Sequence, residues 1–288
     1  MAAPIVDRVA AHARAFEHPL LHGFLEYRDF LATAQWPAAE ELTAAFDSGV
    51  DELAVHVRFA TQNAVLLADG LHYEQRIAES GVIATRERNW HDLFNALVWL
   101  RHPQLKLALN ARQAADIAEV GPKVRTRGQC AMTQFDEAGA IVWCADAALL
   151  TLWDAHDWTG LFLHERAAWG TRIAVTVFGH ALLERQFTGS SALSTAKTIA
   201  VQVDAGEIAS RCAGHGSLIA HWAQAEGRVA QAIRGSVLLL DPQHSRPLPL
   251  VGIPGWHAEG GSPAFYREAP CFRPLRAGRH YPPPFQLT

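Results

Sequence analysis

Apolar positions along the chain recur mostly at helical spacing, and proline and glycine mark the breaks between the predicted helices. Up to about Arg76 the pattern is mainly helical, with residues 38–46 as one clear apolar segment. Residues 50–59 form a second apolar segment, in which Val55 and Val57 alternate with polar neighbours, so a short strand is an alternative there. The first quarter of the chain is therefore predicted to be helical with at most one strand.

The clearest helix is predicted to begin after Asn89, whose side chain suits an N-cap. Asp92 follows at the third helical position, where its carboxylate can reach back to the cap. Pro103 cannot continue this helix but fits the first turn of the next one, which is predicted to run towards Ile117. The apolar stripe of the first helix comprises Leu93, Phe94, Leu97 and Leu100.

The middle of the chain shows both the helical spacing of apolar residues and the alternation typical of strands. Residues 130–135 and 140–143 are predicted to form a β-hairpin, because the acidic segment between them ends on Gly139. Residues 198–203 alternate and are predicted to be a further strand. Helices are predicted over 147–153, 158–169 and 172–187, and over one or two segments that end near Gly235.

Residues 241–288 hold 10 of the 15 prolines together with several aromatic residues. Such a segment cannot be mostly regular, yet it is too apolar for a disordered tail, so we expect an ordered, irregular C-terminal strap over the core. The predicted fold class is α+β: a predominantly helical single core with a β-hairpin, a few short strands and this strap. We expect a helical part (1–120), an α+β part (121–240) and the strap (241–288) in one integrated domain.

Composition narrows the classes of function. The net charge of −4 and the pI near 6.4 argue against a nucleic-acid partner. No stretch reaches 18 apolar residues and the first residues lack the apolar run of a signal peptide, so neither a membrane span nor export is expected, and the protein is expected to be cytoplasmic. The charged fraction of 19% is low, which is compatible with an oligomer. The four cysteines form no zinc-ribbon or redox spacing.

Several segments resemble one known family. They are RNWHDLFNALVWL, the Pro103–Asn110 pattern PxxKxxLN, TQFDEAG, VFGHALLE and LVGIPGW, in this order over most of the chain. They are similar to an uncharacterised bacterial family, domain of unknown function 3025, of which HDLFNAL (residues 91–97) is the most specific signature. The resemblance implies no activity and assigns no catalytic residue, so the chemistry has to be argued from the side chains themselves.

The signature helix places His91, Asp92 and Asn95 on one polar edge of its first turn. The positive end of the helix dipole disfavours imidazolium, so His91 suits the role of a base or a metal ligand, with Asp92 to orient it. The competing interpretation is structural, because Asn89 and Asp92 are adequate caps and His91 could simply satisfy a backbone group.

A second polar edge is predicted on the helix over 172–187, where Thr176, His180 and Glu184 recur every four residues. His180 and Glu184 could ligate a metal from one helix face, although His22 and Glu26 share the spacing, which makes spacing alone a weak signal. If these two residues meet His91 and Asp92, they would supply ligands for a divalent metal such as zinc, manganese or iron.

The leading functional hypothesis is therefore a pocket that binds a small polar ligand or a metal, with hydrolytic or acid/base chemistry. His91, Asp92, His180 and Glu184 are its candidate catalytic residues, and His91, His180 and Glu184 its candidate metal ligands. The further candidates for ligand contacts are Asn95, Trp90, Asn110 and Trp256, the last in a glycine-rich turn. The rival hypothesis is a non-catalytic interaction or scaffold module in which the same residues are caps and core hydrogen bonds.

Overall fold

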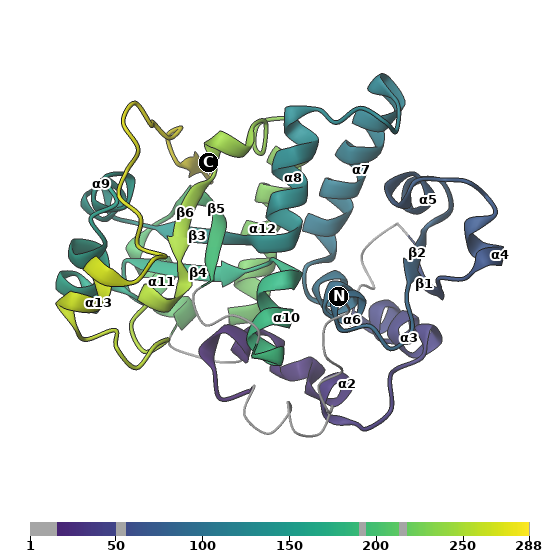
Figure 1. Cartoon of the computed structure of the whole chain (residues 1–288), viewed down its shortest axis with the longest axis horizontal. Coiled ribbons are helices and arrows are strands. Elements are labelled where there is room, and N and C mark those ends of the chain that lie inside the picture. The colour runs from purple at the N-terminus through teal and green to yellow at the C-terminus, as the bar shows by residue number, and fades with distance from the viewer. Residues whose placement is uncertain (1–15, 50–55, 190–193, 213–217, 288) are drawn as a thin grey trace.

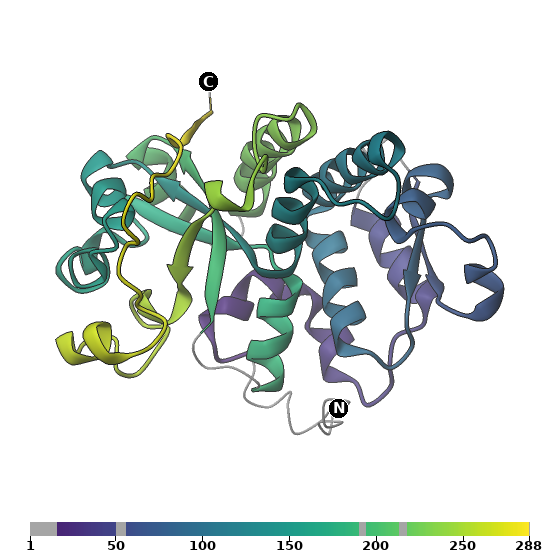
Figure 2. The ribbon, with the colours of Figure 1, turned by 45° about the horizontal axis from the view of Figure 1, so that its top comes forward.

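The computed structural model describes residues 16–49, 56–189, 194–212 and 218–287. The described chain is mostly helical and carries a two-stranded and a five-stranded sheet (Figure 1). The predicted α+β class with predominant helix is confirmed. The two sheets lie on opposite sides of a group of central helices, α6, α7, α8 and α10, in both views (Figures 1 and 2).

The small sheet belongs to the N-terminal part. Its strands β1 (Arg58–Thr61) and β2 (Val82–Thr85) pair in parallel. The strand predicted within 50–59 is thus present only from Arg58, and residues 50–55 lie outside the described residues. The helical elements of this part are η1 (Pro19–Tyr27), α2 (Arg28–Ala32), α3 (Ala39–Gly49), α4 (Ala64–Leu67) and α5 (Tyr73–Ser80).

The signature helix forms as its local signals predict. Helix α6 (Trp90–Arg101) begins after Asn89, whose Oδ1 accepts the backbone N–H of Asp92 at 3.0 Å. Pro103 opens the next helix, α7 (Pro103–Val120), at its N-terminal turn. The stripe residues Leu93, Phe94, Leu97 and Leu100 are all buried. The cap and the proline therefore decide both helix boundaries locally.

The predicted β-hairpin is wrong. Residues 127–138 form helix α8 (Arg127–Ala138), and strand β3 (Gly139–Cys144) follows it without a turn. Thr126 caps the helix reciprocally with Gln129, each side chain accepting the other residue's backbone N–H. This capping box starts a helix whose last turn is the acidic segment that the sequence predicts to be a loop.

The predicted helix over 172–187 is also wrong in its first half. Strand β4 (Ile173–Val177) pairs antiparallel with β3, and helix α10 (His180–Thr188) begins only after Gly179. Thr176 therefore lies on the strand, where its hydroxyl accepts the indole N–H of Trp143 at 2.9 Å. It does not share a helix face with His180 and Glu184, because the sheet pairing of β3 overrides the helical spacing.

The helix predicted over 158–169 is replaced by a π-helical turn, η2 (Gly160–His164), and a 3₁₀ turn, η3 (Arg166–Ala168). The preceding helix is confirmed as α9 (Ala147–Asp154). The predicted strand at 198–203 is present as β5 (Thr195–Gln202), which pairs in parallel with β3. Helices α11 (Ala205–Cys212) and α12 (Leu218–Arg234) then end close to the predicted Gly235.

The C-terminal strap supplies two strands to the large sheet, whose order is β4-β3-β5-β6. Strand β6 (Arg246–Pro249) pairs antiparallel with β5, and β7 (Phe285–Gln286) pairs with the last residues of β5. The other regular elements of the strap are η4 (Pro242–His244), η5 (Leu250–Gly252) and α13 (Pro263–Glu268). Its path along one side of the sheet can be followed in yellow in Figure 2.

The buried apolar side chains form one continuous core. Strand β3 is buried along its whole length, and Trp99, Trp143 and Trp153 are almost inaccessible. Helices α6, α7, α8 and α10 contact one another beside this sheet. Every helix among the described residues is too short or too polar to span a bilayer.

Candidate metal centre

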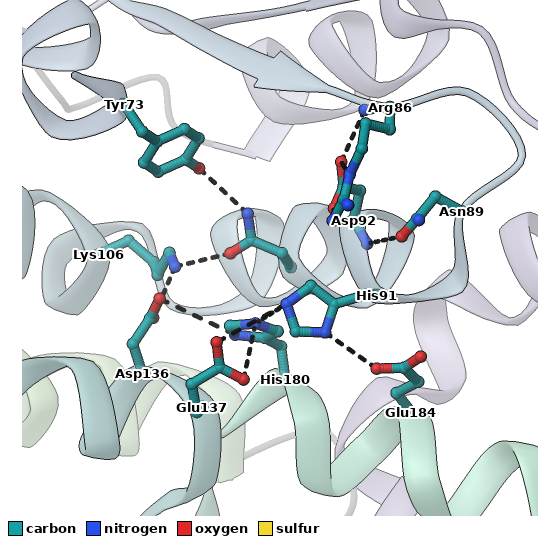
Figure 3. Close-up of polar contacts among 11 residues, drawn as sticks. Tyr73, Arg86, Asn89, His91, Asp92, Lys106, Asp136, Glu137, His180 and Glu184 are labelled. Carbon is teal, nitrogen blue, oxygen red and sulfur yellow. Dashed lines mark hydrogen bonds and ion pairs between the residues drawn. The ribbon is translucent and has the colours of Figure 1, made fainter. Parts of the chain in front are cut away.

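Three helix ends meet at one point of the structure and bring polar side chains together (Figure 3). His91 lies in the first turn of α6, His180 is the first residue of α10, and Glu137 lies in the last turn of α8. We call His91, Glu137 and His180 the candidate metal centre.

Two glycines allow this close approach. A Cβ atom on Gly179 would lie 2.5 Å from both Ala138 Cα and Gly139 N. The backbone N–H of Gly179 donates to the carbonyl oxygen of Gly139 at 2.8 Å. The start of α10 therefore packs directly against the end of α8, which sets His180 beside Glu137.

The ligand atoms of the centre lie close together, with one atom from each residue within 4.8 Å of the others. The two Nε2 atoms of His91 and His180 lie 3.0 Å apart. Oε1 of Glu137 lies 3.7 Å from Nε2 of His91, and its other oxygen, Oε2, lies 3.6 Å from Nε2 of His180. Both imidazoles thus present the same nitrogen to the carboxylate, and the group could hold a metal ion.

The centre is sealed on one side and open on the other. The side chain of His180 is 4% exposed, whereas those of His91 and Glu137 are 34% and 43% exposed. Catalytic zinc sites commonly combine three protein ligands with an accessible fourth position. The arrangement leaves such an access from the solvent-facing side.

Glu184 orients the more exposed histidine. Its Oε2 lies 3.0 Å from Nδ1 of His91, one helical turn beyond His180 on α10. A carboxylate at Nδ1 accepts the proton there and leaves a lone pair on Nε2, as in the carboxylate–histidine–metal arrangements of known metal sites. The hydrogen bond to Glu184 also raises the pKa of His91 above its usual value.

A chain of polar contacts runs inward behind His180. Its Nδ1 is buried without a hydrogen bond, and a carboxylate oxygen of Asp136 lies 3.9 Å away. The other oxygen of Asp136 accepts from the Lys106 ammonium at 2.6 Å, and that ammonium also donates to Asn95 at 2.7 Å. Asn95 in turn donates to the Tyr73 hydroxyl at 3.1 Å. The chain holds Asp136 in place beside the buried imidazole (Figure 3).

Their different burial gives the two histidines different pKa values. Desolvation lowers the pKa of His180 to about 4, so this ring is neutral at physiological pH. Partial burial raises the pKa of Glu137. Although burial acts to raise the pKa of Asp136, the Lys106 charge and its hydrogen bond lower it overall. The group therefore contains a neutral imidazole, a polarised imidazole and several acids close together.

The structure brings together three of the predicted site residues: His91, His180 and Glu184. Asp92, expected to orient His91, instead accepts hydrogen bonds from the backbone N–H and the guanidinium of Arg86 at 2.6 to 3.0 Å. Asn95, expected on the same edge as His91, faces the inward polar chain.

The remaining candidates lie elsewhere. Trp90 packs against Trp36 and Phe187, with ring centroids 4.6 and 4.9 Å apart. Asn110 is buried and donates to the carboxylate of Glu74 at 2.7 Å. Trp256 contacts the ring of His18, and its carbonyl oxygen lies 3.0 Å from Nε2 of that histidine. None of the three contributes to the candidate metal centre.

Sequence reasoning missed Glu137, Asp136 and Lys106. The two acids lie in the segment predicted to be a hairpin turn, so no helix face was assigned to them. The signal that would have found them is the Thr126–Gln129 capping box, which predicts a helix running into the acidic residues. Lys106 stands four residues into α7, and its partner Asp136 is 30 residues away in sequence, which only the fold brings close.

Comparison with known proteins adds a family but no activity. No curated protein and no solved structure matches the chain. The sequence model of one family, described as "Protein of unknown function (DUF3025)", matches residues 57–276 and so spans all the residues of the candidate metal centre. With most of its length matched, the chain belongs to this family of unknown function.

Proposed function

We propose that the protein is a metal-dependent hydrolase in which His91, Glu137 and His180 bind one divalent metal ion, with zinc as the best-suited ion. Two imidazole nitrogens and one carboxylate are the ligand set of several zinc hydrolases. The same set suits iron or manganese, so the ion has to be identified by measurement.

The closeness of these ligand atoms carries this proposal. Two ligand atoms bound at about 2.1 Å to a tetrahedral zinc ion lie about 3.4 Å apart. In the candidate metal centre the two Nε2 atoms lie 3.0 Å apart, and one ligand atom from each of the three residues lies within 4.8 Å of the other two. Rotation of the Glu137 side chain, which is 43% exposed, would therefore bring one of its oxygens to an ion held by both Nε2 atoms.

The surroundings also favour a cation. Glu137, Glu184 and Asp136 lie against the two histidines, and Lys106 is already paired with Asp136. The carboxylates outnumber the lysine and therefore repel one another. A bound divalent ion relieves this repulsion. The centre thus attracts a metal through its charge as well as through its ligand geometry.

The residues around the metal have separable roles in the proposed reaction. A divalent metal of this class lowers the pKa of bound water towards 7 and polarises a carbonyl or phosphoryl oxygen. Glu184 fixes the tautomer of His91, and Asp136 lies where a small movement would give Nδ1 of His180 a hydrogen-bond acceptor. The exposed side of Glu137 and His91 is the side from which water and substrate approach.

Zinc binding to the full chain tests the proposal. Metal-free protein would be titrated with zinc by calorimetry, and the metal content after dialysis would be measured by mass spectrometry. We expect one zinc ion per chain and at least about 100-fold weaker binding in Glu137→Gln, because one of three ligands loses its charge. The zinc-loaded protein would then be assayed for hydrolysis of p-nitrophenyl carboxylate and phosphate esters.

Glu119→Gln is the matched control, since Glu119 is an exposed acid on α7 that makes no contact with the centre. It should bind zinc like the natural chain. Equal zinc affinity in the two variants would overturn the metal site. Zinc binding without turnover of any ester would retain the metal site and reject the hydrolytic role towards these substrates.

A further inference from the structure

A second candidate site lies at the other end of α6. A groove of about 610 Å³ opens between η1, the end of α6, strand β4 and Trp256. Its walls are mainly apolar and include Leu20, Phe24, Leu25, Val175, Val177 and Trp256. Ligand pockets of known proteins typically measure about 300 to 1,000 Å³ and combine apolar walls with a few polar groups.

The groove also contains one deeply buried polar group, His102. Its Nδ1 lies 2.7 Å from Oε2 of Glu226, which comes from α12 across the core. The two side chains are only 2% and 5% exposed. Glu226 therefore occupies Nδ1 of the ring and leaves Nε2 as the ring nitrogen that a ligand can reach.

His102 lines the groove with a small accessible area, since 2% of its side chain is exposed. Among the described residues its Nε2 forms no hydrogen bond, and it is not one of the fully inaccessible polar atoms that lack a partner. The rings of Phe24 and Phe178 contact the imidazole, with centroids 6.0 and 5.6 Å away, and restrict its rotation. His102 therefore offers one fixed ring nitrogen for a hydrogen bond in mainly apolar surroundings.

The rim of the groove carries little unbalanced charge. Besides His102, its titratable lining residues are His22 and the pair Arg101 and Glu26, which lie 3.6 Å apart and balance each other's charge. A charged ligand would lose hydration without a strong partner of opposite sign. An uncharged ligand with one hydrogen-bonding group fits these walls better than an anion or a cation.

We propose that this groove binds a neutral aromatic alcohol, with its ring system against Phe24 and Trp256 and its hydroxyl group hydrogen-bonded to Nε2 of His102. The site is separate from the candidate metal centre. His91 and His102 lie 11 residues apart on and just after α6, which corresponds to roughly 16 Å along the helix axis. Binding here does not depend on the proposed hydrolase activity.

Binding of 2-naphthol to the full chain tests the proposal, with naphthalene as the analogue that lacks the hydroxyl group. Fluorescence titration should show saturable binding of 2-naphthol, and naphthalene should bind about three- to tenfold more weakly because it makes no hydrogen bond. In Leu25→Trp the new ring fills the groove, and the affinity for 2-naphthol should fall at least tenfold. Leu25 is already 42% exposed, so this variant should fold normally.

Val124→Trp is the matched control, because Val124 is 56% exposed and lies in the turn after α7, away from the groove. It should bind 2-naphthol like the natural chain. Absence of saturable 2-naphthol binding, or equal binding by Leu25→Trp, would overturn the site. Equal affinity for naphthalene would overturn the hydrogen bond to His102, which nitrogen-detected NMR of the histidine rings would check independently.

Discussion

Two histidine–carboxylate pairs lie at opposite ends of helix α6, and they differ in burial and in the residues around them. His91 meets Glu184 at 3.0 Å in a half-exposed position, and His102 meets Glu226 at 2.7 Å with both side chains buried. At His91 a second imidazole and a second carboxylate converge on the same point. At His102 the rings of Phe24 and Phe178 contact the imidazole instead. The surroundings thus favour a metal centre at one end and a fixed hydrogen-bonding nitrogen at the other.

The contrast has a physical origin in desolvation. A buried pair is stable only as a unit, because either group alone would be an uncompensated polar or charged group in the core. A half-exposed pair can lose one member at small cost, since water solvates the other. The buried His102–Glu226 pair should therefore matter mainly for stability, and the partly exposed His91–Glu184 pair mainly for metal binding.

The largest expected effect is on folding. His102→Ala leaves Glu226 buried without its partner and should lower the free energy of unfolding by about 3–5 kcal/mol. His91→Ala, made in metal-free protein, should lower it by less than about 1 kcal/mol. Urea unfolding of both variants measures the difference, and equal losses would break the comparison.

Metal removal should have the next largest effect. Zinc at 100 times its dissociation constant should raise the free energy of unfolding by about 2.7 kcal/mol, through binding to the folded state alone. A chelator should reverse this gain, and His91→Gln should abolish it. Stabilisation of His91→Gln to the same extent by zinc would place the metal elsewhere.

The two carboxylates of the pairs can be compared directly. Glu184→Gln should weaken zinc binding by about 10- to 100-fold, because an outer-shell carboxylate tunes the ligand that it orients. Glu226→Gln should leave zinc affinity unchanged within about twofold, since its histidine is not a ligand. Calorimetric zinc titration of both variants measures these effects. A larger loss of zinc affinity in Glu226→Gln than in Glu184→Gln would reject His91 as a metal ligand.

The pH dependence of zinc binding should reveal the unequal histidines. The pKa of His91 is raised by its hydrogen bond to Glu184, and that of His180 is lowered to about 4 by burial. Zinc needs unprotonated nitrogen, so affinity should rise about tenfold per pH unit from pH 6 up to the raised pKa of His91, with one proton released. Glu184→Gln should move the upper end of this rise to lower pH. Release of two protons per zinc in this range would contradict a neutral His180.

The smallest effect should come from the helix cap. Asn89→Ala removes the side-chain acceptor of the Asp92 N–H and should lower the free energy of unfolding by about 1 kcal/mol. Zinc affinity should stay within about twofold of that of the natural chain. Thermal unfolding and a zinc titration on the same sample give both numbers, and a large loss of zinc binding would show that the cap positions His91.

What could be predicted from the sequence is what depends on neighbours in the chain. The Asn89 cap, the Pro103 break and the buried stripe of α6 follow from local signals, and all three are present. His91 is a candidate from its place at the start of the signature helix, and His180 and Glu184 are candidates from their four-residue spacing; the fold brings all three together.

What could not be predicted depends on contacts between distant segments. Strand β4 forms in place of a helix because β3 offers a pairing partner, which periodicity cannot show. Glu137 reaches His180 only through the glycine contact between α8 and α10. Glu226 meets His102 across 124 residues of sequence. Neither carboxylate carries a local signal of its histidine partner.

Anomalous diffraction from zinc-soaked crystals is the most direct test of the central claim. We expect one strong peak about 2.0–2.2 Å from Nε2 of His91, Nε2 of His180 and a carboxylate oxygen of Glu137, with Glu184 still hydrogen-bonded to Nδ1 of His91. A map with no peak among these three side chains, or with zinc bound only at other histidines, would contradict it.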